Sequence, residues 1–202
     1  YTSYWRRALL SASAARAFAE RAHVGNLEDI FLAALLQDIA VLAIDRVQPD
    51  FYGTLSKDAT HAQLAAYETA KLGADHAVLG AWLLEHWKLP DFLHQTVRHS
   101  HAPITTQGED AVVAATRCVA LGGECVDVLL SRRKLTDLGS LSEHARDWLG
   151  MGPEALNDCM TGIVAEIPEM ARLFDTTLME PEVANGILEQ ARELLMIRNL
   201  QA

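Results

Sequence analysis

LAALLQDIAVLAID, residues 32–45, is an apolar run interrupted at its centre by one polar pair, Gln37 and Asp38. The spacing of its leucines, isoleucines and alanines is typical of a helix that is buried on most sides. A carboxylate inside such a helix loses its hydration, so it needs a partner that donates hydrogen bonds or carries positive charge. We therefore expect Asp38 to lie in a polar site within the fold.

Start and stop signals around this run predict one long helix. Asn26 can cap the helix, and the helix dipole favours the two acids that follow closely behind it. The helix is expected to continue to about Arg46, shortly before Pro49. Similar signals recur along the chain, and Ala and Leu dominate the composition. Together they predict an all-α fold, a single compact bundle of about eight helices.

Three later helices carry distinctive residues. A helix is predicted over residues 110–130, with a weak point at the glycine pair Gly122-Gly123. Ser140, followed by Glu143, predicts a capping box at the start of a short helix. The last helix, from Pro181 onward, has an apolar stripe that favours docking onto the bundle. The alternative is a signalling helix that leaves the domain and pairs as a coiled coil.

Composition excludes several classes of function. The net charge of −10 argues against nucleic-acid binding, which normally needs a basic surface. No apolar run approaches the roughly 18 residues needed to cross a membrane. The three cysteines, Cys118, Cys125 and Cys159, form no C-x-x-C pair and are predicted to be small buried hydrophobes in a reducing cytoplasm. The sequence also lacks a nucleophile elbow and a phosphate-binding glycine loop.

Most histidines and tryptophans have patterns that predict structural roles. His76 follows the helix cap Asp75, and two interpretations stay open: a pocket residue, or a ring hydrogen-bonded to backbone or to Glu68. His99 and His101 are two positions apart and cannot share a helix face unless the helix has ended, so exposed helix-end positions are predicted. The histidines without any partner pattern are His23, His61, His86, His94 and His144. The tryptophans predicted to pack in the core are Trp5, Trp82, Trp87 and Trp148.

The segment GADHAVLGAWLLEHWKLPDFLHQTVRHSH, residues 73–101, carries a family resemblance. It resembles the HDOD domain, a relative of the HD metal-dependent phosphohydrolases. The residues that match are Glu68, Asp75-His76, Gly80, Leu83-Leu84, Trp87, Leu89-Pro90, the region around His99, and Trp5 with Arg6-Arg7 near the start. The run around Asp38 resembles the family's degenerate His-Asp helix. The resemblance covers about residues 1–130 and is loose beyond them.

The resemblance implies four places where HD hydrolases hold metal ligands: an early His, an adjacent His-Asp pair and a later Asp. By alignment, these places hold Arg7, Gln37, Asp38 and the neighbourhood of Thr116 in this chain, so Asp38 alone is retained. An arginine cannot lose its proton in a protein. A single positive charge about 4 Å from a divalent ion costs roughly 8 kcal/mol at an effective dielectric of about 20. We therefore predict no catalytic residue, no metal site and no cofactor.

Arg7 is instead expected to form an ion pair with Asp38, because a guanidinium offers two parallel donors to a carboxylate. On this interpretation the former metal site has become a structural contact. The residues expected to line the remnant pocket are Arg7, Gln37, Asp38, His76, His99 and Thr116.

The sequence thus predicts a non-catalytic regulatory or interaction module of bacterial signal transduction, located in the cytoplasm. Residues 1–180 would form the HDOD-type domain, and residues 181–202 a helix that docks or leads to an output module. Because the chain begins at Tyr1 and ends inside a predicted helix, we expect it to be a segment of a longer protein. The family implies signalling proteins or a fused output domain as partners, with a link to cyclic dinucleotides; homo-oligomer formation stays open. The alternatives are a divergent phosphohydrolase using Asp38, His76 and His99, and a small-molecule sensor.

Overall fold

The computed structural model describes residues 2–56, 59–103, 110–130, 134–174, 178 and 181–199. This part of the chain contains helices and one 3-10 turn, and no strand. The elements are α1 (Thr2–Ala22), α2 (Leu27–Leu36), α3 (Ile39–Val47), η1 (Phe51–Thr54), α4 (His61–Leu72), α5 (His76–His86), α6 (Asp91–His99), α7 (Asp110–Leu130), α8 (Lys134–Leu149), α9 (Pro153–Leu173) and α10 (Pro181–Asn199). The all-α bundle expected from the sequence is confirmed.

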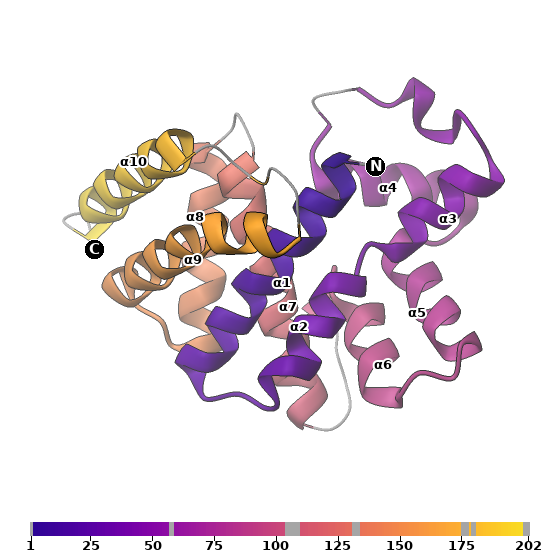
Figure 1. The fold of residues 1–202 in the computed structure, drawn as a ribbon, viewed down its shortest axis with the longest axis horizontal. Coiled ribbons are helices and arrows are strands. Elements are labelled where there is room, and N and C mark those ends of the chain that lie inside the picture. Colours follow the sequence, from indigo (N-terminus) through magenta and orange to yellow (C-terminus); the bar gives the residue numbers. More distant parts are fainter. Residues whose placement is uncertain are drawn as a thin grey trace.

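The helices form two groups on either side of a central layer (Figure 1). The central layer consists of α1, α2 and α7, and α1 packs against both of the others. Helices α8, α9 and α10 lie at one end of the molecule, and α3 to α6 lie at the other. Among the described residues, no helix combines the length and apolarity that a membrane span requires.

The long helix predicted around Asp38 is divided in two, so that prediction is wrong in detail. Helix α2 ends at Leu36 and α3 begins at Ile39, with Gln37 and Asp38 in a turn between them. Asp38 has φ −102° and ψ 11°, in the bridge region rather than in a helical conformation. Helix α5 packs closely on this turn, because a Cβ at Gly80 would lie 3.7 Å from the Gln37 carbonyl oxygen. The turn places Asp38 directly before α3, where its carboxylate makes no capping hydrogen bond to the helix.

Small side chains let α1 and α7 approach closely. The buried face of α1 is rich in alanine, including Ala8, Ala12 and Ala15. On α7, the glycine pair Gly122-Gly123 lies inside an unbroken helix rather than at a weak point. A Cβ at Gly122 would approach the Ser11 carbonyl oxygen to 2.6 Å, which no real side chain tolerates. Gly122 is therefore a packing contact between the two helices.

The three cysteines are buried and free, as the sequence predicts. Burial raises the pKa of Cys118 to about 12 and that of Cys159 to about 11, and it raises the pKa of Cys125 as well. Because the thiolate is the reactive form, we expect no reaction with a disulfide reagent such as Ellman's reagent in the native protein at pH 8. All three thiols should react in denaturing urea. Fast labelling of a native thiol would contradict the burial of these side chains.

Three of the four tryptophans lie on the surface, so the prediction that they pack in the core is wrong for them. Trp5, Trp82 and Trp87 are about half exposed. Trp82 stacks on His86 one helical turn later, which covers only one face of its ring. Trp148 does pack against the core and stacks on His144. The apolar face of α5 is supplied by Ala77, Ala81 and Leu84 instead, leaving the larger aromatic rings outside.

The C-terminal helices extend the core. Helix α8 begins at Lys134, so Ser140 and Glu143 lie inside the helix and the predicted capping box is wrong. The buried side chains Leu138 and Leu141 explain the longer helix, because they continue its apolar face toward the N-terminus. Helix α10 packs on α9 and buries Ile187 and Ala191, which is the docked arrangement among the two alternatives.

Candidate functional site

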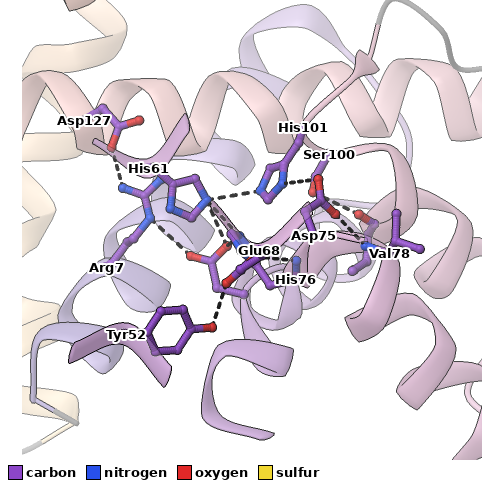
Figure 2. A network of polar contacts seen from close by, with 12 residues as sticks. Arg7, Tyr52, His61, Glu68, Asp75, His76, Val78, Ser100, His101 and Asp127 are labelled. Atoms are coloured by element: carbon purple, nitrogen blue, oxygen red, sulfur yellow. Dashed lines mark hydrogen bonds and ion pairs between the residues drawn. The ribbon is translucent and has the colours of Figure 1, made fainter. Parts of the chain in front are cut away.

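Three histidines, His61, His76 and His101, point toward one another (Figure 2), and Asp38, in the turn before α3, completes the group. The Nε2 atom of His61 lies 3.1 Å from the Nε2 atoms of both His76 and His101. Oδ1 of Asp38 lies 3.4 Å from His61 Nε2 and 3.3 Å from His76 Nε2. One ligand atom from each of the four residues falls within 4.8 Å of all the others. We call these residues, Asp38, His61, His76 and His101, the His-Asp cluster.

Helix ends position the cluster. His61 is the first residue of α4, behind the capping box of Thr60 and Gln63. His76 is the first residue of α5, behind the cap Asp75, whose carboxylate accepts the Val78 N–H. A side chain at the first helical position points outward from the N-terminus, so both rings can face the Asp38 turn.

Carboxylates outside the cluster orient two of the rings. Nδ1 of His76 lies 2.6 Å from Glu68 Oε2, and the Tyr52 hydroxyl donates to the other oxygen of Glu68 at 2.6 Å. Nδ1 of His101 lies 3.3 Å from Asp75 Oδ2. Because a carboxylate accepts hydrogen bonds, each of these Nδ1 atoms carries its proton. The Nε2 atoms of His76 and His101 then point into the cluster.

Burial and charge set the protonation states. Although burial alone raises it, His61, His76 and Arg7 hold the pKa of Asp38 well below its usual value, so this residue is a carboxylate. Burial and the charge of Arg7 lower the pKa of His61 to about 3, so this ring is neutral. Burial lowers the pKa of His76, but Asp38 and Glu68 outweigh it and raise the value to about 9. Without a metal ion, His76 is therefore a cation at neutral pH, with a proton on each ring nitrogen.

Arg7 approaches Asp38 from the side opposite the histidines. Its Nε donates to Asp38 Oδ2 at 3.1 Å, and its Nη1 donates to Asp127 Oδ1 at 2.5 Å. The predicted ion pair between Arg7 and Asp38 is confirmed. The second carboxylate, Asp127, is on α7 (Figure 2). Despite burial, the two carboxylates raise the pKa of Arg7, so it remains a cation.

The structure brings together only some of the residues predicted for the remnant pocket. Arg7, Asp38 and His76 belong to the network described above, and the Glu68 contact predicted for His76 is present. Gln37 lies buried beside it, with an amide nitrogen that has no hydrogen-bond partner. His99 and Thr116 take no part in these contacts: His99 ends α6, and Thr116 is fully buried with an unpartnered hydroxyl.

His61, His101 and Asp127 belong to the site, although no pattern in the sequence placed them there. His61 and His76 are 15 residues apart and His101 follows 25 residues later, so no local spacing links them. One signal was available: Thr60-His61 and Asp75-His76 each place a histidine directly behind a helix cap. His101 lies beyond the end of α6 at His99 and enters the cluster with its side chain 16% exposed, so the exposed helix-end position predicted for it is wrong.

Comparison with known proteins places the chain in a family. Residues 1–103 match the HDOD domain family, which is half of the chain. A crystal structure described as "Putative phosphohydrolase from Shewanella amazonensis" shares the fold at 16% sequence identity with a TM-score of 0.51. The alignment covers 96% of this chain, which spans 62% of that protein. No curated protein matches. The helices around the Asp38 turn and the family match lead to one conclusion: this chain belongs to the HDOD domain family.

Proposed function

We propose that this HDOD domain is a non-catalytic regulatory module of a signalling protein. The observation that carries the proposal is the Arg7 guanidinium between Asp38 and Asp127. By resemblance, Arg7 stands where HD hydrolases hold a metal-binding histidine, and Gln37 stands where they hold a second. A guanidinium that bridges two carboxylates provides the positive charge that a catalytic ion would otherwise supply there. The site then holds the fold together instead of activating water.

The regulatory mechanism follows from the arrangement of the helices. A partner or ligand that binds the α3 to α6 end would shift these helices against the central layer of α1, α2 and α7. Such a shift reaches α10 through α9, which packs on both α1 and α10. When a ligand binds one packing arrangement better than another, packed helices change between these discrete arrangements rather than bend continuously. An adjoining output module would respond to the change in the position of α10.

The alternative function is phosphoester hydrolysis, and the His-Asp cluster is the observation that favours it. A catalytic ion needs an open coordination position and access for the substrate. His76 is fully buried, Asp38 is 3% exposed, and the rings of His61 and His101 are 12% and 16% exposed. All four would point at one centre, so protein groups would fill a tetrahedral coordination shell. This burial supports the non-catalytic proposal.

An activity survey tests the proposal. Purified protein would be incubated with phosphomonoesters, phosphodiesters and cyclic dinucleotides in the presence of Mn²⁺, Fe²⁺ or Zn²⁺. We expect release of product at the rate of the protein-free blank, because no water can be activated in a filled, buried shell. The matched control is the Asp38→Asn variant, purified identically. Turnover that is present in the wild type and lost in this variant would establish a hydrolase and overturn the proposal.

A further inference from the structure

We propose that the His-Asp cluster binds one divalent transition-metal ion of the Zn²⁺ class, and that this ion holds helix α4 on the domain. The inference goes beyond the proposed function, because a structural ion is compatible with a module that has no catalysis of its own. It rests on donor geometry, on an unpartnered buried oxygen, on charge balance and on the packing of α4.

Four of the six separations between the donor atoms match those of a tetrahedral ion, and all six lie within 4.8 Å. Bonds of about 2.0 to 2.1 Å from Zn²⁺ to nitrogen or oxygen place tetrahedral ligand atoms about 3.3 Å from one another. The four shortest separations in the cluster are 3.1, 3.1, 3.3 and 3.4 Å. They join His61 to each of the other three ligands and His76 to Asp38. Imidazole and carboxylate are ligands that Zn²⁺ and its neighbours in the first transition series accept.

With neutral imidazole rings, the form that binds a metal ion, hydrogen bonding leaves this site unsatisfied. Glu68 and Asp75 fix the protons of His76 and His101 on Nδ1, so both Nε2 atoms face the single Nε2 of His61. One proton on that nitrogen cannot serve two imidazole lone pairs and a carboxylate together. Oδ1 of Asp38 is buried and has no hydrogen-bond partner. A cation at the centre would satisfy all four acceptors at once.

Charge balance also favours a cation. Four carboxylates take part in this network, from Asp38, Glu68, Asp75 and Asp127. The one guanidinium in the network, Arg7, contacts the far oxygen of Asp38 and leaves Oδ1 free to face the histidines. Glu68 is fully buried, so water cannot screen its charge effectively. Its contact with His76 is the carboxylate–histidine arrangement that commonly supports a metal ligand.

Helix α4 is attached through this cluster and through Tyr67, whose ring contacts Phe51 of η1 and whose hydroxyl donates to the Phe51 carbonyl oxygen. Glu68 is the one fully buried residue of α4, and no residue of α4 belongs to the apolar core. Its inward contacts are polar: His61 reaches His76 and His101, and Glu68 reaches His76 and Tyr52. A helix with no residue in the apolar core gains little from burial of apolar area. An ion that joins His61 to Asp38, His76 and His101 would supply the missing attachment.

Metal binding is tested on the purified chain, stripped with a chelator and titrated with Zn²⁺ and with Co²⁺. We expect one equivalent of Zn²⁺ to bind, and Co²⁺ to give the intense visible absorption of tetrahedral coordination. His61→Ala and His101→Ala should each weaken Zn²⁺ binding by more than about 100-fold, because changes in supporting residues alone cost 10- to 100-fold. His61 makes no contact in the apolar core, so its replacement should leave the rest of the bundle folded. His99→Ala, two residues from a ligand but outside the cluster, is the matched control.

Hydrogen exchange tests the role of the ion. Zn²⁺ should slow exchange of the α4 amides, residues 61–72, and leave those of α9 unchanged. The same addition to His61→Ala should have no effect on α4. The inference is overturned if the chain binds no Zn²⁺, if both ligand variants bind it as the wild type does, or if α4 exchange is insensitive to the ion. Hydrolysis of a phosphoester by the Zn²⁺-loaded protein would overturn the proposed function and leave this inference standing.

Discussion

Arg7→Ala is expected to lower the free energy of unfolding by about 3 to 5 kcal/mol, the usual cost of removing one partner from a buried ion pair. The substitution leaves Asp38, which is 3% exposed, without the cation that contacts its Oδ2. It also leaves Asp127 on α7 without the donor at 2.5 Å. The two carboxylates, one in the turn before α3 and one on α7, would then repel each other without a cation between them. Urea unfolding followed by circular dichroism measures the change.

A second arginine on the same helix supplies the control. Arg21 pairs with Asp158 at 3.2 Å, but both side chains are about half exposed or more. Exposed pairs of this kind contribute about 0 to 1 kcal/mol, so Arg21→Ala should change stability little. Equal losses from Arg7→Ala and Arg21→Ala would show that the guanidinium of Arg7 has no special structural role. A double-mutant cycle with Asp127→Asn then separates the contact with Asp127 from the rest of the effect.

The sequence alone was sufficient for the fold class and for one side of the site. Cap residues and apolar spacing predict most helix bounds to within a few residues, because both signals are local. The ion pair between Arg7 and Asp38 was also predictable. A buried carboxylate needs a cation, and the resemblance placed Arg7 at the same former metal site as Asp38. The division of the helix at Gln37-Asp38 was not predictable, because the apolar spacing continues on both sides of this pair and neither residue is a helix breaker.

The histidine side of the site could not be predicted from periodicity. His61, His76 and His101 come from three different helix ends and meet only through tertiary packing. The exposed tryptophans illustrate the same limit: Trp82 lies between apolar neighbours in the sequence, but small residues fill the buried face of α5. Asp127 was not predicted, because the resemblance indicated Thr116, eleven residues earlier on α7. Eleven residues correspond to about three helical turns, or roughly 16 Å, so the contact with Arg7 lies farther along the helix than the resemblance implied.

Gly122→Ala is expected to destabilise the domain by about 1 to 3 kcal/mol, the range for overpacking a tight interface. An added Cβ would lie 2.6 Å from the Ser11 carbonyl oxygen and 2.9 Å from both the Cβ and the backbone nitrogen of Ala15. Two of these atoms belong to the α1 backbone, which cannot turn away as a long side chain can. Helices α1 and α7 must therefore separate, and the loss exceeds the roughly 1 kcal/mol that alanine gains over glycine inside a helix.

Gly162→Ala provides the matched control for this loss. Gly162 lies within α9, and a Cβ there meets nothing within 4 Å. The same substitution should therefore raise the free energy of unfolding by about 0.5 to 1 kcal/mol, through helix propensity alone. Opposite signs for the two variants, measured by urea unfolding under one set of conditions, would attribute the cost at Gly122 to contact between α1 and α7. A stabilising effect of Gly122→Ala would mean that the two helices do not approach as closely as described. Because α1 carries Arg7 and α7 carries Asp127, their separation in Gly122→Ala should also weaken the coupling between these two side chains.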